Sequence, residues 1–380
     1  MTTSEAPGAA QPWILQFCHG YDGPFLDCAR QYAALFADTR YKVCTVYLTG
    51  KPSAEVEQGS ASDEVIFLDY SSREVRGLKL KAIRDIKRIV AAHDFKLCIA
   101  HRFKPIYIAL LGSSLPVIGV HHAFGDYQRL SRRLFANAFK KRLALLGVSD
   151  AVRDDMRTCL PSWPAERIQT LYNRIDIAAV QAGQVSRSAA REHLGLPPDA
   201  WVVGNVGRLH PDKDQATLIR GFAQALPQLP KGSLLVIMGS GRLEAALKTL
   251  ANELAVADSV RFLGQVADGR RYFKAFDTFA LTSDHEPFGM VLLEAMAAGV
   301  PVVCSDCGGG REVAGKSGLM FTLGSAEELT SCLLRLSVEL PQAQPDFISG
   351  LNERVIALFS DDASRDVFWN LPMVVCLRLS

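Results

Sequence analysis

Two carboxylates, Glu286 and Glu294, lie eight residues apart in a segment that joins a turn to a run of helix formers. Glu286 opens a Pro-Phe-Gly turn, and Glu294 lies about one turn into a run of strong helix formers that begins at Met290. Gly299 and Pro301 end that run. The free N–H groups of a helix N-terminus suit a phosphate, and a carboxylate beside them can accept hydrogen bonds from sugar hydroxyls. This spacing therefore predicts a site for a nucleotide sugar.

Two cations follow a strand that is predicted at residues 201–206. Arg208 and Lys213 lie in the loop after it, and Gly207 allows the backbone to approach a ligand closely. Because Arg can bind a phosphate in a bidentate manner and Lys adds a second charge, the pair is suited to neutralise a diphosphate. A pair of solvated surface cations is the ordinary alternative.

Other enzyme classes fit these residues less well. Glycoside hydrolases place paired carboxylates across the scissile bond, whereas Glu286 and Glu294 belong to one loop and helix beside two cations. The sequence contains no Gly-x-Ser-x-Gly nucleophile elbow and no HExxH zinc motif. A dinucleotide-dependent oxidoreductase is disfavoured, because the nearest Gly-rich turn has Glu244 where G-x-G-x-x-G requires its third glycine.

Short apolar runs alternate with helical patterns along most of the chain. Such alternation is typical of α/β folds, in which helices cover both faces of a parallel sheet and ligands bind at the carboxyl ends of the strands. Strands are predicted at residues 13–18, 42–48, 65–68, 97–100, 117–120, 145–148, 201–206, 233–238, 260–262, 278–281 and 301–304. Helices are predicted at residues 25–36, 75–92, 130–143, 151–159, 215–225, 242–253, 269–275 and 290–298. The pattern predicts an α/β protein with a doubly wound domain in each half.

Breaks in this pattern suggest the domain boundaries. The polar stretch 180–188 is typical of a linker or of a first surface segment, and the stretch from Pro341 to Pro345 is expected to break the chain. The predicted segments are residues 1–176, 177–345 and 346–380, with helices at 346–360 and 361–369 and an apolar tail at 371–379. No specific role is predicted for that tail.

Composition limits the class of protein. Hydrophobic residues make up 48% of the 380 residues, and both charge signs are common, as in globular proteins. No run of about 20 apolar residues occurs, so no membrane-spanning helix is expected. The nine scattered cysteines fit reduced thiols better than a disulfide framework. Residues 1–11 lack the basic and apolar regions of a signal peptide, so a cytoplasmic location is expected.

Positive charge is concentrated in the first half of the chain, with +6 for residues 1–176 and −4 for residues 177–380. Much of it lies in two basic stretches: Lys79, Lys81, Arg84, Lys87 and Arg88, then Arg129, Arg132, Arg133, Lys140, Lys141 and Arg142. These stretches are either a solvated face or a surface for a phosphate-bearing acceptor at a membrane. Nucleic-acid binding is not expected, because no aromatic-interleaved or helix-turn-helix pattern accompanies the charge.

Several segments carry a resemblance to a known family. The segment from Glu286 to Glu294 resembles the E-x-F-G-x-x-x-x-E motif of retaining glycosyltransferases of family 4, which have the GT-B fold. Gly207-Arg208-Leu209 with Lys213 is similar to the family's G-R-L-x-x-x-K segment, and residues 302–313 are similar to its strand followed by G-G-x-x-E. A weaker match has Arg174 where the family usually has Gly. The matches run in order from about residue 14 to residue 322.

The resemblance implies two Rossmann-like, doubly wound domains that face each other across a cleft, with terminal helices that cross back to the first domain. The first domain would bind the acceptor and the second the nucleotide sugar. The residues that match Arg208 and Lys213 bind the donor diphosphate in the family and stabilise the leaving group. The residue that matches Glu294 binds the ribose hydroxyls, and the one that matches Glu286 lies near the transferred sugar.

Further donor-site residues are implied by the same resemblance. The backbone N–H groups of Gly289, Met290 and Val291 are expected to help hold the phosphates or the sugar. Phe262 or Leu263 is expected beside the nucleobase, with simple core packing as the alternative.

In the first domain, the resemblance implies a loop after the first strand and one functional histidine. Gly20 and Gly23 take the place of the family's Gly-rich loop, which here has only two glycines and an added proline. After the strand at residues 117–120, His122 fits the family's histidine best and His121 next. His101 is a weaker candidate.

The implied function is transfer of a hexose from a nucleotide diphosphate donor, UDP-linked, with retention of configuration and without a bound metal or cofactor. The expected acceptor is a glycan or lipid-linked glycan of lipopolysaccharide core biosynthesis, reached by peripheral contact with the cytoplasmic face of the inner membrane. A soluble acceptor and a non-catalytic nucleotide-sugar-binding module are the alternatives. The presence of Arg208, Lys213, Glu286 and Glu294 favours an enzyme.

Overall fold

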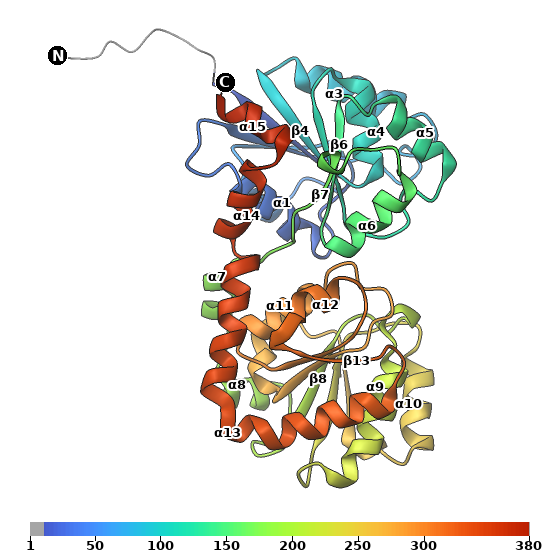
Figure 1. Ribbon diagram of the computed structural model, residues 1–380, viewed down its shortest axis with the longest axis vertical. Helices are drawn as coiled ribbons and strands as arrows, with labels where there is room; N and C mark the ends of the chain where they lie inside the picture. The colour runs from blue at the N-terminus through green and yellow to red at the C-terminus, as the bar shows by residue number, and fades with distance from the viewer. Residues whose placement is uncertain (1–10, 380) are drawn as a thin grey trace, which may run out of the picture. The chain divides into compact units, whose positions relative to one another are not determined.

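The computed structural model describes residues 11–379, without the side chains of residues 339–349, 351–352, 376 and 378–379. It divides into two compact units, Met1–Asn173 with Ser364–Ser380, and Arg174–Ala363. Each unit consists of a parallel sheet flanked by helices (Figure 1). The predicted lack of a signal peptide concerns residues 1–11, of which residues 1–10 lie outside the described residues. The predicted α/β fold with two Rossmann-like domains is confirmed.

The sheet of the first unit has seven parallel strands in the order β3-β2-β1-β4-β5-β6-β7. The strands are β1 (Trp13–Cys18), β2 (Lys42–Tyr47), β3 (Glu64–Phe67), β4 (Phe95–His101), β5 (Val117–His121), β6 (Leu143–Gly147) and β7 (Ile168–Thr170). From β1 the chain adds strands on one side as far as β3, and then returns to add β4 on the other side of β1. The winding direction therefore reverses between β1 and β4, which is where open α/β sheets bind ligands.

The helices of the first unit lie between these strands and at the end of the chain. They are α1 (Phe25–Ala34), α2 (Ala54–Gly59), α3 (Leu80–Val90), α4 (Phe103–Gly112), α5 (Leu130–Ala138), α6 (Asp150–Cys159), the 3-10 helix η1 (Ala165–Arg167), α14 (Asp361–Trp369) and α15 (Pro372–Leu379). The pattern did not predict α2, α4 or β7, and it placed the start of α3 at residue 75, five residues too early. The residues from 75 to 79 form turns instead, with Lys79 in the left-handed region at φ 56°.

The sheet of the second unit has six parallel strands in the order β10-β9-β8-β11-β12-β13. The strands are β8 (Val202–Val206), β9 (Leu234–Met238), β10 (Val260–Gly264), β11 (Thr278–Leu281), β12 (Val302–Ser305) and β13 (Leu319–Phe321). Here the winding direction reverses between β8 and β11. The loops that follow these two strands hold Arg208, Lys213 and Glu286, so the topology brings the predicted donor residues to one edge of the sheet.

The helices of the second unit include two that precede its first strand, and the others lie between and after the strands. They are α7 (Ile177–Gly183), α8 (Arg187–His193), α9 (Gln215–Ala225), α10 (Glu244–Glu253), α11 (Met290–Ala297), α12 (Gly308–Ala314) and α13 (Ala326–Phe359), with the 3-10 helices η2 (Pro211–Lys213), η3 (Leu226–Gln228), η4 (Ala257–Ser259), η5 (Gly269–Ala275) and η6 (Gly315–Ser317). The polar stretch at residues 180–188 is therefore helical for much of its length and is not an extended linker. Leu218 and Phe222 of α9 pack with Leu329 and Leu333 of α13 in the buried core.

The break predicted between Pro341 and Pro345 is wrong, because α13 is one helix from Ala326 to Phe359. The predicted boundary after residue 345 consequently falls inside this helix. Proline removes a backbone donor and crowds the preceding turn, and a helix accommodates it by bending. Figure 1 shows that α13 changes direction along its length.

The apolar tail has a structural role in the first unit. Leu371, Val374 and Leu377 are buried, and the Tyr41 hydroxyl donates a 2.7 Å hydrogen bond to the Leu377 carbonyl. The indole N–H of Trp369 donates to the Leu35 carbonyl at 3.0 Å. The tail thus completes the first unit. Among the helices of residues 11–379, none is both long and apolar enough to cross a membrane.

Candidate functional site

The central contact of the second unit is an ion pair between Lys213 and Glu286. The Lys213 ammonium lies 2.7 Å from Oε2 of Glu286, and the two side chains are only 19% and 10% exposed. The Ser283 hydroxyl donates a second hydrogen bond to the same oxygen at 3.2 Å. A partly buried carboxylate needs such partners, and the arrangement leaves Oε1 as the oxygen that these two contacts do not use.

Backbone contacts tie the loops after β8 and β11 together. The Thr282 hydroxyl donates to the Lys213 carbonyl at 2.8 Å, and the Asp284 N–H donates to the Asp212 carbonyl at 3.0 Å. Asp214, in the left-handed region at φ 41°, caps α9 by accepting from the Thr217 N–H. These bonds hold the Lys213 ammonium at a defined place at the switch point of the sheet.

Arg208 lies beside this pair but is held loosely. Its side chain is 71% exposed, and its guanidinium contacts the Asp212 carboxylate at 3.2 Å. An exposed pair of this kind contributes little to stability, so the guanidinium can turn to an incoming anion at little cost. Its backbone is fixed, because the Gln215 side-chain amide donates to the Arg208 carbonyl at 2.9 Å.

The N-terminus of α11 supplies the helix end that the sequence predicts. Gly289 is the N-cap, at φ 98°, and no side chain caps this end. The first N–H groups of the helix, from Met290 and Val291, follow it directly. The Glu286 carbonyl accepts a 2.8 Å hydrogen bond from the Gly309 N–H, which fixes the preceding loop. Glu294 lies one turn along α11 and is half-buried.

Two glycines after β9 allow the chain to cross the loop that leads to Arg208. A Cβ on Gly239, which is at φ 138°, would overlap the Gly207 carbonyl oxygen, and a Cβ on Gly241 would overlap the Leu209 carbonyl oxygen. A Cβ on Gly207 would meet nothing within 4 Å. Between these two segments, the residue that must lack a side chain is therefore Gly239 and not Gly207. A close approach of Gly207 to a ligand remains a prediction.

Phe262 and Leu263 lie in β10, at the edge of the second sheet. Phe262 packs against the core of the unit, and the Lys248 ammonium lies 5.6 Å from the centre of its ring. These contacts use the face of β10 that is covered by α10. A contact between Phe262 or Leu263 and a nucleobase remains a prediction.

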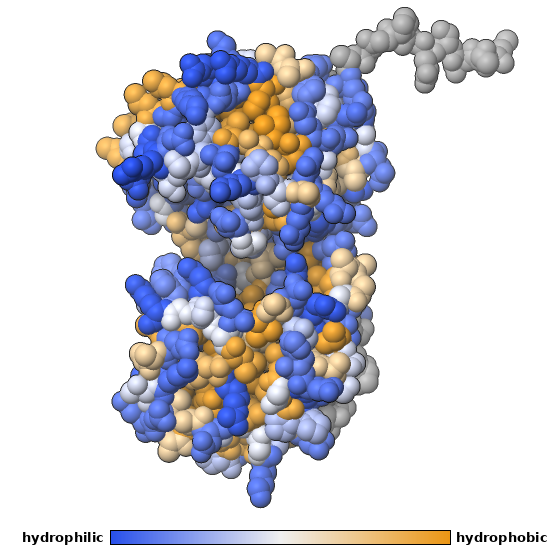
Figure 2. Space-filling view, turned by 180° about the vertical axis from the view of Figure 1, so that it is seen from behind, coloured by the Kyte–Doolittle hydropathy of each residue, from blue (hydrophilic) through white to orange (hydrophobic). Residues whose placement is uncertain are grey.

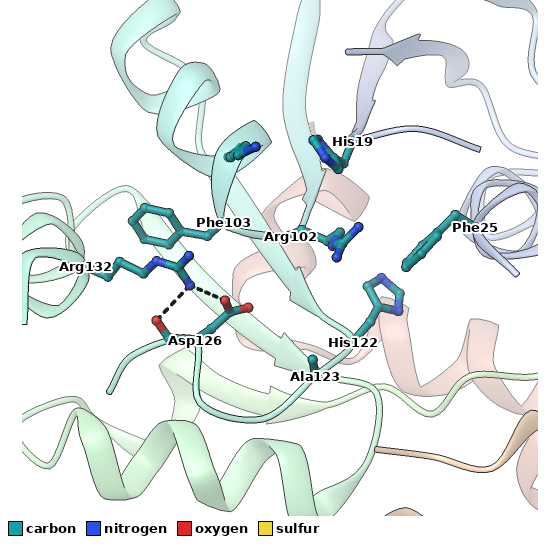
Figure 3. Close-up of a pocket in the computed structure, with 9 residues that line it drawn as sticks. His19, Phe25, Arg102, Phe103, His122, Ala123, Asp126 and Arg132 are labelled. Carbon is teal, nitrogen blue, oxygen red and sulfur yellow. Dashed lines mark hydrogen bonds and ion pairs between the residues drawn. The ribbon is translucent and has the colours of Figure 1, made fainter. Parts of the chain in front are cut away.

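The first unit has a pocket of about 220 Å³ at the carboxyl ends of β1, β4 and β5, close to its own switch point. Figure 3 shows Arg102 and His122 directed toward each other in its centre, with His19 and Phe25 beside them. The lining residues are His19, Phe25, Arg102, Phe103, Lys104, His122, Ala123, Asp126 and Arg132. His122 is thus brought into a pocket, as the sequence predicts.

The three candidate histidines differ in their surroundings. His122 lines the pocket, and its Nε2 lies 3.1 Å from Nδ1 of His101. His121 is fully buried, with Nδ1 2.7 Å from the Asp126 carboxylate and Nε2 3.1 Å from the Tyr127 hydroxyl. Burial lowers the pKa of His101 to about 3, and burial and then His101 lower the pKa of His122. His122 is therefore the histidine that is open to a ligand.

The two predicted glycines of the first unit have different constraints. Gly20 faces Thr49, since a Cβ there would lie 2.8 Å from the Thr49 hydroxyl oxygen. A Cβ on Gly23 would meet nothing within 4 Å, so it is the backbone conformation of this residue, at φ 60°, that favours glycine. Neither lines the pocket, and a ligand contact for them remains a prediction.

Sequence reasoning missed two of the three cations of the first pocket, Arg102 and Lys104. Arg102 and Lys104 follow β4, and Arg132 belongs to α5. The signal for the first two was available, because charged residues directly after a buried strand lie at the ligand-binding edge of a sheet. Arg132 belongs to a basic stretch that the sequence assigns either to a solvated face or to a surface for a phosphate-bearing acceptor. Only the fold places it in this pocket.

Two family models match the chain. Residues 28–179 match the model described as Glycosyltransferase Family 4, and residues 186–337 match the model described as Glycosyl transferases group 1. The first match falls in the first structural unit and the beginning of the second, and the second match covers most of the second sheet.

Curated relatives match parts of the chain. The lipopolysaccharide core biosynthesis glycosyltransferase LpsE of Rhizobium meliloti is 31% identical over 223 residues, which cover 57% of this chain and 64% of LpsE. A D-inositol 3-phosphate glycosyltransferase of Actinosynnema mirum is 34% identical over 175 residues, which cover 43% of this chain and 41% of the relative. The chain thus spans less than two thirds of the length of the relatives it matches.

The fold matches solved structures over nearly the whole chain. Alr3699/HepE of Anabaena, solved in complex with UDP, has a TM-score of 0.77 and 21% identity, with 97% of this chain and 100% of that chain covered. At this identity the likeness concerns the fold. Taken with the two family matches and the ordered motifs, it shows that the chain belongs to the glycosyltransferases of family 4, with the GT-B fold.

Proposed function

We propose that this chain is a retaining hexosyltransferase that moves a sugar from a UDP-linked donor to a glycan acceptor. The observation that carries the proposal is the meeting of Lys213, Glu286 and the N-terminus of α11 at the switch point of the second sheet. Arg208, exposed beside them, adds a second cation. A diphosphate and the sugar attached to it have the charge and the hydroxyl groups that such a site recognises.

The proposed chemistry is one of positioning and electrostatic stabilisation. The bond between the anomeric carbon and the diphosphate oxygen breaks. The acceptor hydroxyl oxygen bonds to that carbon on the same face, and the hydroxyl proton passes to the departing diphosphate. Negative charge grows on the departing diphosphate, where Lys213, Arg208 and the helix end are placed to stabilise it. Because these groups supply positive charge, the proposed reaction uses no bound metal or cofactor.

A panel of donors tests the reaction class. Purified chain is incubated with UDP-, GDP- and ADP-linked hexoses, and nucleotide release is measured with and without a lipid-extracted glycan acceptor. We expect release from a UDP-hexose that rises when acceptor is added. The UDP complex of HepE supports this choice of base. Donor binding without turnover under every condition would instead indicate a nucleotide-sugar-binding module.

The acceptor is proposed to be a lipopolysaccharide core glycan. The name of LpsE supports this assignment, and the positive charge of the first half fits an anionic acceptor. The name of the Actinosynnema mirum relative supports the alternative of a small soluble acceptor. Two kinds of extract distinguish these acceptors. An extract with lipid-linked core glycans should raise nucleotide release if the acceptor is a core glycan, and an extract with only soluble sugars should raise it if the acceptor is small and soluble.

The reaction is proposed to occur at the cytoplasmic face of the inner membrane, where the chain would bind peripherally through its first unit. Leu78, Leu80, Leu130 and Leu134, which we call the leucine face, are 68%, 69%, 61% and 60% exposed. Helix α4 links the two halves of this face: Lys79 lies 4.7 Å from the Tyr107 ring, which lies 4.9 Å from the Phe135 ring of α5.

Basic residues lie next to the leucines of the leucine face along the chain, among them Lys79, Lys81 and Arg129. Figure 2 shows apolar side chains among hydrophilic ones at the edge of the first unit that carries α3 to α5. Exposed leucines with a basic rim suit the interface of an anionic bilayer, since each Lys or Arg near such a surface contributes about 1 kcal/mol.

Vesicle binding tests the leucine face. We expect the chain to sediment with vesicles of phosphatidylglycerol and phosphatidylcholine, and the double variant Leu130→Ser/Leu134→Ser to bind about tenfold more weakly, since it loses two apolar anchors. Leu254→Ser, at an exposed leucine of the second unit, is the matched control and should bind like the wild type. Equal binding of all three proteins would refute this membrane contact.

A further inference from the structure

The pocket of the first unit contains more positive charge than its own residues neutralise. Three cationic side chains line it: Arg102 at the start of α4, Lys104 in its first turn, and Arg132 from α5. Asp126 is the one carboxylate among the nine lining residues. The pocket is thus built for a ligand that brings negative charge.

Asp126 is already engaged by other groups. One carboxylate oxygen lies 2.7 Å from Nδ1 of His121, and the other accepts from the Arg132 guanidinium (Figure 3). Arg132 also donates to the Asp126 backbone carbonyl at 3.1 Å. Within residues 11–379 the structure records no ion pair for the side chains of Arg102 and Lys104. These two cations are therefore the ones available to a ligand.

The crowding of positive charge lowers the pKa values of basic groups in the pocket. Burial lowers the pKa of Lys104, and Arg102, Arg76 and Arg132 lower it further. Burial lowers the pKa of His19 to about 4, and Arg102 and Lys104 add to this effect. At neutral pH His19 is therefore uncharged, and its buried Nδ1 has no hydrogen-bond partner among the described residues. An anion in the pocket would relieve the repulsion between the cations. It would also provide an acceptor for a hydrogen bond from the neutral His19 ring.

Arg102 is held in place at some conformational cost. Its φ of 72° lies in the region that favours glycine, and strain of this kind persists where the surrounding structure imposes it, often at functional sites. Its N–H donates to the Val120 carbonyl at 2.8 Å, and its guanidinium lies 4.9 Å from the centre of the Phe25 ring. The Arg132 guanidinium lies in the same way over Phe103, at 4.6 Å.

The size of the pocket limits the ligand. The pocket, of about 220 Å³, has room for an anionic group and part of the sugar that carries it. Guanidinium groups bind phosphate and carboxylate oxygens in a bidentate manner.

We infer that the acceptor carries a phosphate or carboxylate group, which Arg102 and Lys104 bind in this pocket with His19 beside it. The inference rests on the proposed glycosyltransferase function and specifies its acceptor as an anionic sugar. A neutral sugar would leave both cations, of which Arg102 is exposed and Lys104 half-buried, to water alone.

Three sugars of similar size serve as probes for the full-length chain: glucose 6-phosphate, glucuronate and glucose. Calorimetric titration should detect binding of one or both anionic sugars and none of glucose, and the stronger of the two identifies the anionic group. In Lys104→Gln and Arg102→Gln, affinity for that sugar should fall about 10- to 100-fold, as expected for the loss of a charged hydrogen bond. Equal binding of glucose, or unchanged affinity in both variants, would overturn the inference.

Lys96→Gln is the matched control, because it removes the same charge at the opposite end of β4, where Lys96 pairs with Asp94 at 2.9 Å. It should bind the anionic sugars like the wild type. Thermal unfolding of each variant shows whether it is folded. If Lys104→Gln does not fold, a folded Arg102→Gln protein still decides the test.

UDP titration separates this inference from the proposed function. We expect UDP affinity to be unchanged in the Lys104 and Arg102 variants, and UDP not to displace the anionic sugar. In assays with the acceptor extract, the acceptor KM should rise about 10- to 100-fold in these variants while the donor KM stays the same. Competition by UDP would assign the cations to the donor and overturn the inference. No nucleotide release by the wild type would instead refute the proposed function.

Discussion

Replacing Lys213 with alanine should lower turnover by about 100-fold or more, the usual effect of losing one preorganised group that stabilises developing charge. The Lys213 side chain is 19% exposed, and its ammonium lies at the switch point of the second sheet, 2.7 Å from Glu286. In the proposed reaction it neutralises the departing diphosphate, and its position is fixed by the contacts of the loops around it. Nucleotide release at saturating donor and acceptor is the measurement. Arg208→Ala should have an effect of similar size, since its guanidinium is the second cation of the site.

Loss of Lys213 also affects folding, and the two effects have to be separated. Breaking a buried ion pair leaves an uncompensated charge, which can cost about 3–5 kcal/mol. The double variant Lys213→Ala/Glu286→Gln removes both charges and should regain part of the thermal stability without regaining turnover. Lys231→Ala, at an exposed lysine before β9, is the control and should match the wild type in both respects. A folded Lys213→Ala protein with wild-type turnover would contradict the assigned role.

The strands and the loops at their ends could be predicted because their sequences satisfy simple physical rules. The apolar runs of β1, β8 and β11 are short and rich in residues that favour strands. Once two strands are parallel neighbours, their loops meet at one edge. The contact between Lys213 and Glu286, which are 73 residues apart, follows from the pairing of β8 with β11. Periodicity does not specify that pairing, and the resemblance to a known family supplied it.

Several elements could not be predicted because local sequence preference disagrees with the structure. Helix α12 begins with Gly308, Gly309 and Gly310, which disfavour a helix in isolation. Helix α4 is buried over most of its surface, so it lacks the amphipathic pattern that identifies a helix. In α13 the prolines at 341 and 345 suggested a break, and the helix continues past them with a bend.

One departure from the family pattern could be interpreted only with the structure. Arg174, which replaces the usual Gly, is fully buried, and its Nε donates to the Asp361 carboxylate at 2.6 Å. The two residues are 187 positions apart, so no local pattern connects them. A buried arginine requires such a partner. The acidic start of α14, which had no predicted role, supplies the carboxylate that Arg174 contacts.

The cations of the first pocket show where sequence reasoning stops for the candidate site. Arg102 and Arg132 are 30 residues apart and come from different elements, so only the fold brings them to one cavity. The positive φ of Arg102 could not be predicted from its residue type, because the residue usually found in this conformation is glycine. The resemblance ranked His122 above His121, and the burial of His121 against Asp126 and Tyr127 is consistent with that ranking.

Replacing Gly309 with alanine should nearly abolish turnover and destabilise the second unit, although this residue has no functional group. A Cβ at this position would lie 2.5 Å from the Cα of Phe288 and 2.5 Å from the Pro287 carbonyl oxygen, and both are backbone atoms that cannot rotate away. The loop that holds Glu286 would have to move, and its hydrogen bond from the Gly309 N–H would be distorted. Overpacking of this kind costs about 1–3 kcal/mol, and a displacement of about 1 Å at a reacting group can lower the rate about 100-fold.

Gly310→Ala provides the matched control, since it makes the same chemical change in the next residue of the same helix. The nearest atoms to its new Cβ would be Cδ1 of Leu292 at 3.7 Å and Cγ of Glu286 at 3.8 Å, which are ordinary contacts. Alanine is also a better helix former than glycine by about 0.5–1 kcal/mol, so the melting temperature should hold or rise, and turnover should stay within a few-fold of the wild type. If Gly309→Ala and Gly310→Ala melted and turned over alike, the close approach of α12 to the loop of Glu286 would not be what positions this carboxylate.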